Sequence, residues 1–306
     1  MQRQYKNHLS NFKEWNQKNH ANKWLLFPEN IGEYLSLDET EMSNGELYTI
    51  LTNKSAKGKE DAIVAMIAGT KSEVIISIIN KILISKREQV REVTVDMANN
   101  MNLVIKHCFH KADIVIDRFH VQKLAGEAVQ DIRIKYRWEA IDKENLEIEK
   151  SKKENSMYKP IILSNGDTIK QLLARSRHLL FKPEIRWTNS QKQRSKILFE
   201  HYPKIEQAYR LSQKLSHIYD TNTHKSTAMT KLAQWYKDVE ESNFKAFNTV
   251  ARSFYLHYNK ILNYFNNRST NASAESFNAK IKRFRAEFRG VKDLSFFLFR
   301  LTNIFT

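Results

Sequence analysis

The sequence predicts an α/β fold whose mixed sheet is interrupted by a long all-helical region. Short β runs alternate with amphipathic helical segments up to residue 120, and strand patterns are almost absent from 121 to 267. One basic amphipathic helix follows near the C-terminus. Hydrophobic residues make up 41% of the 306 residues, enough for a buried core, and only 7 Gly and 4 Pro favour long helices over an all-β fold.

The chain is expected to begin with a polar lead segment, residues 1–30, followed by three strands. Four aromatic residues of the lead segment are spaced for one packed face: Phe12, Trp15, Trp24 and Phe27. Short apolar runs separated by turn residues, including the hairpin signal Asn44-Gly45, predict the strands. These strands cover residues 31–38, 46–51 and 62–68.

Helices and strands then alternate. Residues 72–84 repeat apolar side chains at helical spacing, and the segments after them predict a strand, a helix, a strand and a helix in turn. These cover residues 93–96, 97–109, 112–117 and a helix that starts near Phe119. The order β-β-β-α-β-α-β-α is that of the RNase H-like fold, which has its first acid on strand one and its second just after strand four. Asp38 and Asp96 fall at those places.

The middle of the chain is predicted to be an all-helical insertion. Helices are expected at 122–148, 168–180, 190–215, 227–239 and 243–265, and the charged stretch 142–160 is expected to include a solvated turn or a mobile loop. The expected organisation is therefore a lead segment, a first part of the RNase H-like core, the insertion and a second part of the core. Their boundaries are 1–30, 31–120, 121–267 and 268–306.

A helix beginning near Ser273 is predicted to carry two different faces. An apolar stripe is formed by Phe277, Ile281, Phe284 and Phe288, whereas Glu275, Asn278 and Lys282 lie on another face. Glu275 falls in the first turn, where the helix dipole favours negative charge. Gly290 is expected to end the helix, and residues 294–304 predict a last helix that packs on the sheet.

The charge balance points to a polyanionic partner. Lys and Arg number 50 against 34 Asp and Glu, a net charge of +16, which is typical of nucleic-acid binding, although a generally basic surface is the alternative. Cys108 is the only cysteine, which excludes a disulfide framework and a thiolate zinc site and fits a reducing cytoplasm. Neither a signal peptide nor a membrane-spanning stretch is predicted.

Three carboxylates on separate elements suggest metal-dependent phosphodiester chemistry. Asp38, Asp96 and Glu275 could converge from two strand ends and a helix. Two divalent ions about 3.5–4 Å apart can polarise the phosphate, activate the attacking oxygen and stabilise the leaving oxygen, and Mg²⁺ prefers carboxylate ligands. Each residue also has an ordinary structural explanation, as a cap or turn former for the aspartates and as a dipole partner for Glu275.

A second cluster follows the predicted fifth strand, in the run Asp117-Arg118-Phe119-His120. Asp117 would lie beside Asp96 in this fold, so it competes with Asp38 as a metal ligand, although we rank it lower. His120, about one turn on, could orient a phosphate or a carboxylate, or it could cap and pack. Asp117, His120 and Asn278 are therefore expected to support the site.

The C-terminal helix also carries a basic run that could neutralise DNA phosphates; its alternative role is a solvated helix face. The cations are Lys280, Lys282, Arg283, Arg285 and Arg289.

These segments together resemble the ISL-three family of bacterial insertion-sequence transposases, in particular its ISAon-one-like branch. The resemblance spans most of the chain and is weakest in the helical middle. Its most specific parts are the Asp-Arg-Phe-His block and the Asn-x-x-x-Glu-x-x-Asn helix. It is carried by residues 27–32, 36–40, 93–97, 112–121 and 271–282.

The resemblance implies a DDE triad of Asp38, Asp96 and Glu275 that binds two Mg²⁺ ions, with Mn²⁺ able to take their place. It further implies a helical insertion between the second and third acids, and a Cys/Asp-x-x-His motif at Asp117 and His120 that supports the site or the DNA. Family members usually carry an N-terminal zinc-binding or helix-turn-helix region, whereas 37 residues without cysteine precede Asp38. An upstream-encoded protein that binds the element ends is the expected partner, unless this copy is truncated.

We therefore expect the catalytic subunit of a DNA transposase, acting on element ends and target DNA in the bacterial cytoplasm as a homo-oligomer. Three alternatives stay open from the residues. They are a stand-alone Mg²⁺-dependent nuclease, a decayed DNA-binding protein without catalysis, and a generic basic helical scaffold.

Overall fold

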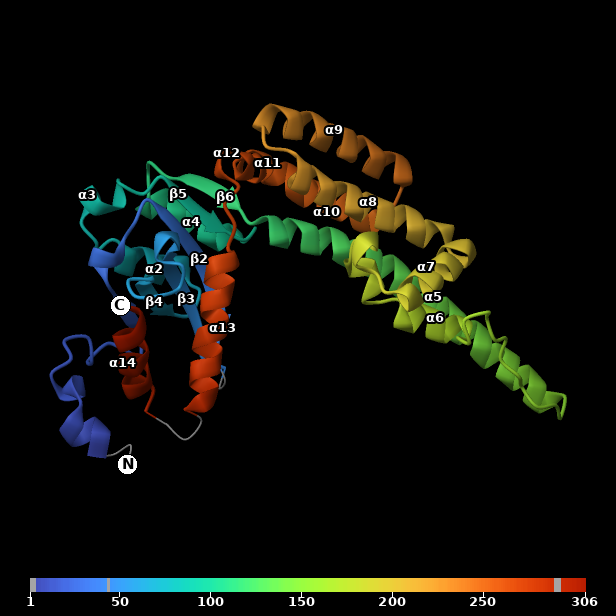
Figure 1. The fold of residues 1–306 in the computed structure, drawn as a ribbon, viewed down its shortest axis with the longest axis horizontal. Coiled ribbons are helices and arrows are strands. Elements are labelled where there is room, and N and C mark those ends of the chain that lie inside the picture. The colour runs from blue at the N-terminus through green and yellow to red at the C-terminus, as the bar shows by residue number, and fades with distance from the viewer. Residues whose placement is uncertain (1–3, 43–44, 289–292) are drawn as a thin grey trace. The chain divides into compact units, whose positions relative to one another are not determined.

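The computed structural model describes residues 4–42, 45–288 and 293–306, and the chain divides into two compact units (Figure 1). The first, which we call the sheet unit, comprises Met1–Asp117 and Asn259–Thr306. The second, the helical unit, comprises Arg118–Tyr258. Three residues named in the sequence analysis lie outside the described residues. They are Asn44 of the expected hairpin turn, Arg289 of the expected DNA contacts, and Gly290, which was expected to end the helix.

The sheet unit contains a six-stranded mixed sheet in the order β1-β4-β3-β2-β5-β6. β1, β4, β3 and β2 pair antiparallel in that order, whereas β2 pairs parallel to β5 and β5 parallel to β6. The mixed α/β class is thus confirmed. The strands are β1 (Trp24–Leu26), β2 (Tyr34–Glu41), β3 (Leu47–Asn53), β4 (Ile63–Ala68), β5 (Glu92–Val95) and β6 (Asp113–Ile116).

Two strand expectations need correction. The lead segment contributes β1, which was not among the predicted strands because three residues are too short to show an alternating pattern. The first predicted strand was expected to end at Asp38, but β2 continues to Glu41, since Glu39 to Glu41 keep pairing with β3 despite their polarity.

Seven α-helices of the described residues lie in the sheet unit. One of them, α11 (Tyr258–Leu262), begins one residue before the unit boundary at Asn259. The predicted helix 72–84 ends earlier, at Ile79, and a separate short helix begins at Ile84 after Leu83, which has an extended ψ of 137°. The helices are α2 (Ser72–Ile79), α3 (Ile84–Arg87), α4 (Asn99–Cys108), α11 (Tyr258–Leu262), α12 (Tyr264–Asn267), α13 (Ala272–Glu287) and α14 (Leu294–Phe305).

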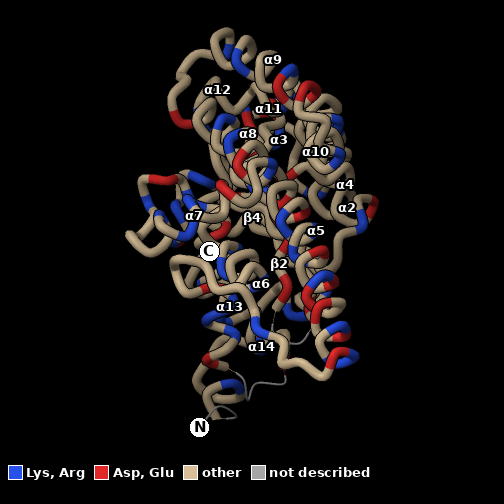
Figure 2. The backbone as a smooth tube through the Cα atoms, turned by 90° about the vertical axis from the view of Figure 1, so that its right-hand side faces the viewer, with Lys and Arg blue, Asp and Glu red and all other residues tan. Residues whose placement is uncertain are grey.

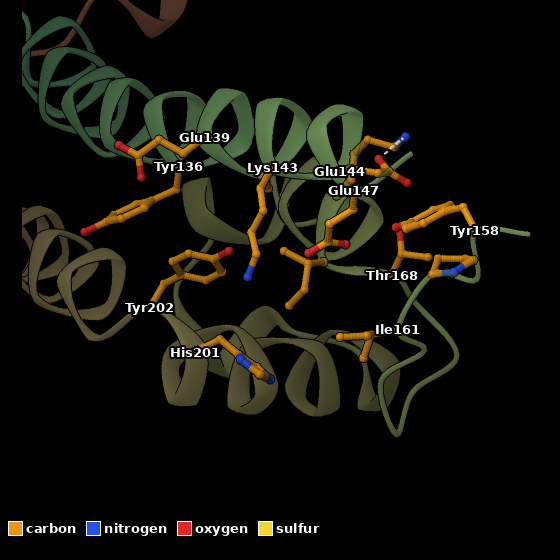
Figure 3. Close-up of a pocket in the computed structure, with 14 residues that line it drawn as sticks. Tyr136, Glu139, Lys143, Glu144, Glu147, Tyr158, Ile161, Thr168, His201 and Tyr202 are labelled. Carbon is orange, nitrogen blue, oxygen red and sulfur yellow. Dashed lines mark ion pairs between the residues drawn. The ribbon is translucent and has the colours of Figure 1, made fainter. Parts of the chain in front are cut away.

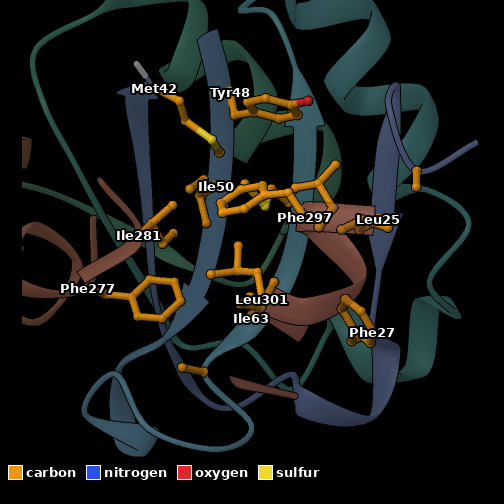
Figure 4. Packing of buried hydrophobic residues seen from close by; sticks show 14 residues of the cluster. Leu25, Phe27, Met42, Tyr48, Ile50, Ile63, Phe277, Ile281, Phe297 and Leu301 are labelled. Atoms are coloured by element: carbon orange, nitrogen blue, oxygen red, sulfur yellow. The ribbon is translucent and has the colours of Figure 1, made fainter. Parts of the chain in front are cut away.

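One face of the sheet carries the core that holds α13 and α14. Side chains of β1, β3 and β4 pack against both helices, as Figure 4 shows for Ile50, Ile63 and Leu25. Phe277 and Ile281, from the predicted apolar stripe of α13, are at most 1% exposed, and Phe284 packs against the same cluster. Burial of this stripe fixes which side of α13 faces the sheet.

The lead segment packs largely on α14. The ring centroid of Phe12 lies 5.2 Å from that of Phe296 and 5.4 Å from that of Phe299. Trp15 contacts this pair as well, whereas Phe27 belongs to the sheet core and Trp24 stacks on His20. The four aromatic residues therefore do not share the single packed face that their spacing suggested.

The helical unit consists of helices joined by short turns and by two longer segments, residues 154–168 and 176–188, with one isolated β-bridge between Ile162 and Thr168 in its described residues. The predicted helix 190–215 is divided at Pro203, which begins α8 and is well suited to a first helical position. The helices are α5 (Arg118–Lys153), α6 (Ile169–Arg175), α7 (Asn189–His201), α8 (Pro203–Thr221), α9 (Lys225–Ser242) and α10 (Lys245–Leu256).

The charged stretch 142–160 lies mostly within α5, which continues to Lys153 before the chain turns. Lysines alternate there with Asp and Glu, mostly at exposed positions. Figure 2 shows the mixed charges along α5. Such mixed charges support a solvated helix through pairs one turn apart, for example Lys150 with Glu154. No helix in the described residues combines the length and apolar composition needed to cross a bilayer.

A buried acid ties three segments of the helical unit together. Asp167, 1% exposed, accepts from Arg194 Nε at 2.9 Å and also pairs with Arg175. Burial by itself raises the pKa of Asp167, but the hydrogen bonds and charges of the two arginines outweigh it and lower the pKa below 3.8. The loop before α6 is thereby fastened to α6 and α7.

We expect Asp167→Asn to destabilise the helical unit by about 3 kcal/mol, because both arginines lose their charged partner. Since the folded-state pKa is lowered, this stabilisation is present above the ordinary carboxyl pKa and is lost as the pH falls through the lowered value. The free energy of unfolding is measured by urea denaturation, with the fluorescence of the buried Trp187 and Trp235 as the signal. The exposed Asp142→Asn is the matched control, and equal stability of the two variants would contradict the prediction.

Candidate active site

Three aspartates line up across one half of the sheet. The register pairs Ser36 of β2 with Thr94 of β5, so the next pair on the same face is Asp38 and Asp96. Val95 pairs with Ile116, which makes Asp117 the neighbour of Asp96, and the Asp117 N–H donates to the Val95 carbonyl at 2.8 Å. Because adjacent strands lie about 4.8 Å apart, the three carboxylates form one row, which we call the acid row.

The same row continues over the other half of the sheet with apolar side chains. Asp38 pairs with Ile50, Ile50 with Met66, and Met66 with Leu25. These three partners belong to the core under α13 and α14. The face that bears the acids is therefore the face that α13 covers, and the helix lies at the boundary between its apolar and acidic halves.

Asp38 and Asp96 are both half-buried and partly hydrogen-bonded within their own strands and turns. Asp38 Oδ1 accepts from the Glu39 N–H at 2.9 Å, and Asp96 Oδ1 accepts from the Ala98 N–H at 2.8 Å, next to the start of α4. Asp96 thus follows β5 directly, as predicted. It also stabilises the turn between β5 and α4, which is the structural role expected of an aspartate after a strand. A carboxylate has enough lone pairs for such a bond and a metal ion.

Negative charge is concentrated around these two residues. Glu39 points to the opposite face, where Asn100 of α4 donates to its Oε1 at 3.4 Å. Burial is the largest cause that raises the pKa of Glu39; the Asn100 hydrogen bond lowers it, and the charges of Asp96 and Asp38 raise it further. The end of β2 and β5 is consequently a place where a cation would relieve repulsion between like charges.

Glu275 lies in the first turn of α13, exposed, with the helix dipole in its favour. Asn271 and Asn278, four residues before it and three after it, both contact the acidic half of the sheet. Residues at this spacing share one side of a helix, so Glu275 lies on the side of α13 that faces the acid row. Among the described residues, no three Asp, Glu, His or Cys side chains converge as a metal-binding group.

Asp117 and His120, which the sequence placed together, belong to different units. Asp117 is fully buried, and its Oδ1 accepts from the Asn271 N–H at 3.3 Å. His120 is half-buried in the first turn of α5, in the helical unit. Of this pair, only Asp117 belongs to the acid row.

Sequence reasoning missed a buried network in the layer below the acid row. Lys54 Nζ donates to Thr94 Oγ1 at 2.7 Å and lies 3.4 Å from Oε1 of Glu92. The other carboxylate oxygen of Glu92, Oε2, accepts a hydrogen bond from Asn267 Nδ2 at 3.1 Å. Burial lowers the pKa of Lys54, while the charge and hydrogen bond of Glu92 and the charge of Asp117 raise it. Lys54 follows a strand in sequence and carries no motif, so only the three-dimensional structure could reveal it.

The predicted DNA-contact residues fall into different environments. Lys282 and Arg283 are exposed on α13, and Lys280 donates to the Gly58 carbonyl at 2.9 Å. Arg285, by contrast, is 4% exposed, lies 2.9 Å from Glu46 Oε1 and has its guanidinium 4.7 Å from the Phe297 ring centroid. Its predicted role in DNA binding does not fit this placement, because a buried, paired guanidinium cannot reach a phosphate.

The helical unit contains a separate cavity of about 380 Å³ that shares no residue with the acid row (Figure 3). The tilted rings of Tyr136 and Tyr202 lie at one side of it, 4.9 Å apart, and Glu139, Lys143 and Glu147 project from α5. Burial, followed by the charge of Glu139, raises the pKa of Tyr136. Its lining carries charges of both signs, from Lys143 and Lys170 and from three glutamates of α5.

We expect Arg285→Ala to cost about 3–5 kcal/mol of stability, because it leaves Glu46 partly buried without its cation. Arg283→Ala removes a side chain that is 84% exposed and should change stability by at most about 0.5 kcal/mol. Urea denaturation of both variants measures the difference. Equal, small changes would restore Arg285 to the DNA-contact set.

Comparison with known proteins assigns the chain to a family. A model of the ISL-three (ISL3) family of DDE transposases, described as "Transposase", matches residues 35–301, a range that includes the acid row and α13. The comparison with curated proteins and that with solved structures each gave no match. Since the family model covers most of the chain, this protein belongs to the ISL-three family of transposases.

Proposed function

We propose that this chain is the catalytic subunit of a DDE transposase that cleaves DNA at the ends of an insertion sequence and joins them to target DNA. The observation that carries the proposal is the acid row, with α13 held over it. Three carboxylates of neighbouring strands and one of a covering helix, in a chain of net charge +16, suit chemistry on a polyanion.

The proposed cofactor is Mg²⁺, with Mn²⁺ as a substitute. The residue types suit this ion, because Asp38, Asp96 and Glu275 offer hard carboxylate oxygens and Mg²⁺ needs only a few of them beside waters and phosphate. In the described residues these three side chains do not converge as a metal-binding group, so they would have to approach one another when the ions and DNA bind. Two bound ions would polarise the scissile phosphate, activate water or a 3′-hydroxyl, and stabilise the leaving oxygen. The neighbouring carboxylates of Asp38 and Asp96, which the strand register places side by side, support a cation site at the ends of β2 and β5.

The residues have distinct proposed roles. Asp38 and Asp96 bind from adjacent strands, and Glu275 binds from the first turn of α13. Asp117, fully buried, holds the backbone at the start of α13 through its bond to the Asn271 N–H. His120 is proposed to support the DNA or the site, a role that the resemblance to the family implies.

The DNA backbone is proposed to contact the exposed side of α13. Lys282 and Arg283 are its best candidates, with Lys280 beside them. Arg285 is left out because it is buried, and Arg289 lies outside the described residues. Cations at these positions would place the phosphate chain next to Glu275.

The wider proposal follows the family. The sheet unit is an RNase H-like core, the helical unit is an insertion between the second and third acids, and the active form is a homo-oligomer. An upstream-encoded protein of the ISAon-one-like kind would recognise the element ends, in the cytoplasm and on nucleoid DNA. A stand-alone nuclease and a decayed DNA-binding protein are the competing functions.

Strand transfer tests the proposal. Purified chain, with and without the upstream-encoded protein, is incubated with labelled element-end DNA, target plasmid and Mg²⁺. We expect joined products that disappear in Asp96→Asn and Glu275→Gln, since each removes a metal-binding charge. Cleavage without joining would indicate the nuclease, and DNA binding without either product would indicate the decayed protein.

A second measurement tests the DNA contact. The double variant Lys282→Ala, Arg283→Ala should bind DNA more weakly at every sequence, and its plot of log affinity against log salt should be shallower by about 1.8, that is about 0.9 per phosphate contact. A matched double variant on α5, Lys150→Ala with Lys152→Ala, should keep the original slope. An unchanged slope in the α13 variant would remove this helix from the DNA interface.

A further inference from the structure

Two asparagines lie on either side of Glu275: Asn271, at the N-cap of α13, and Asn278, in its second turn. Asn271, Glu275 and Asn278 follow one another at i, i+4 and i+7, on one side of the helix. The exposed Glu275 lies between two side chains that are 1% and 7% exposed. A buried amide on each side of an exposed carboxylate is unusual for a surface helix, because amides cost free energy to bury.

Asn271 connects the start of α13 to two strands. Its Oδ1 accepts from Ser36 Oγ at 2.7 Å, and its backbone N–H donates to Asp117 Oδ1 at 3.3 Å. Ser36 lies on β2 and Asp117 follows β6, with β5 between them. This one residue therefore anchors the helix across the whole acidic half of the sheet.

Asn278 connects the second turn of α13 to the acid row itself. Its Nδ2 donates to Asp38 Oδ2 at 2.7 Å, a charge-assisted bond that fixes one oxygen of that carboxylate. An amide suits this position because it donates a hydrogen bond without adding charge. An aspartate would repel Asp38, and a lysine would neutralise it and compete with a metal ion.

The hydrogen bonds supply what the hydrophobic contact cannot. Phe277 and Ile281 hold α13 on the apolar half, but burial is non-directional and tolerates a small rotation or slide of the helix. The two asparagines contact fixed points on the sheet, one turn to either side of Glu275. They determine the axial position and the rotation of the helix, and with them the position of Glu275.

Two buried atoms indicate that this arrangement is not optimised for stability. Asn271 Nδ2 and Asn278 Oδ1 have no hydrogen-bond partner within the described structure. A buried amide that uses half its hydrogen-bonding capacity is costly compared with an apolar residue of the same size. Proteins commonly accept such a cost at functional sites. Here the other amide atom of each asparagine makes the hydrogen bond that the site needs.

We propose that Asn271 and Asn278 are positioning residues, an amide clamp that holds Glu275 over the acid row before any metal ion binds. The role of the clamp in catalysis rests on the proposed function. Its hydrogen bonds form without a metal ion. Removing a group that holds a metal-binding side chain in place typically lowers metal affinity or activity by about 10–100-fold.

The test uses the full chain with Asn278→Leu, which keeps the volume and the helix, and Asn278→Gln, which keeps the amide. Ser276→Ala, at an exposed position of α13, is the control. Hydrogen exchange of α13 amides in metal-free protein, Mg²⁺ affinity by calorimetry, and kcat and KM for strand transfer are measured. Thermal unfolding shows that each variant folds.

We expect Asn278→Leu to stay folded, to speed exchange in the first two turns of α13 while α14 stays protected, and to weaken Mg²⁺ binding about 10-fold or more. The value of kcat should fall with KM for DNA unchanged, and Asn278→Gln should recover part of both losses. Faster exchange with unchanged Mg²⁺ affinity and kcat would overturn the proposal, since the asparagine would then be merely structural.

Failure of the proposed function looks different. If the original chain itself neither binds Mg²⁺ nor joins strands, the transposase chemistry fails, and exchange alone decides the clamp. Unchanged exchange in Asn278→Leu and in Asn271→Ala would then overturn the clamp as well.

Discussion

The arrangement of this protein depends on a single row of residues that crosses the sheet on one face. Leu25, Met66 and Ile50 occupy it on β1, β4 and β3, and Asp38, Asp96 and Asp117 occupy it on and after β2, β5 and β6. The apolar half needs a cover to exclude water, whereas the acidic half needs hydrogen bonds and access to cations. One helix, α13, meets both needs because its stripe of Phe277 and Ile281 adjoins a polar side.

The sequence could predict the parts of this site that depend on local pattern. Alternating β runs gave five of the six strands, Asp96 follows its strand as expected, and the apolar stripe of α13 is buried. What it could not predict depends on contacts between distant segments. The reach of Asn271 to Ser36, the burial of Arg285 against Glu46 and the bond of Lys54 to Thr94 join residues 235, 239 and 40 positions apart.

Arg285 illustrates why a charge pattern alone misleads. It lies in a run of cations on an amphipathic helix, where solvent or phosphate is the ordinary partner. Its position four residues after the buried Ile281 instead turns it inward, where Glu46 and the Phe297 ring satisfy the guanidinium. Sequence periodicity gives the angle of a side chain around the helix, but it does not show which neighbours lie at that angle.

The helical unit separates Asp117 from Asn271 by 154 positions, yet the two are joined by a hydrogen bond. Asn263 Nδ2 also donates to the Ile114 carbonyl at 3.0 Å, so the chain leaves and re-enters the sheet unit at neighbouring points. A folded insertion brings its own two ends together and so adds little closure entropy, whereas the same residues unfolded would be a long flexible loop whose closure costs free energy. The acid row and its covering helix can therefore be assembled from opposite ends of the chain, provided that the helical unit folds; a change that unfolds it should loosen α13 although no residue of the site is altered.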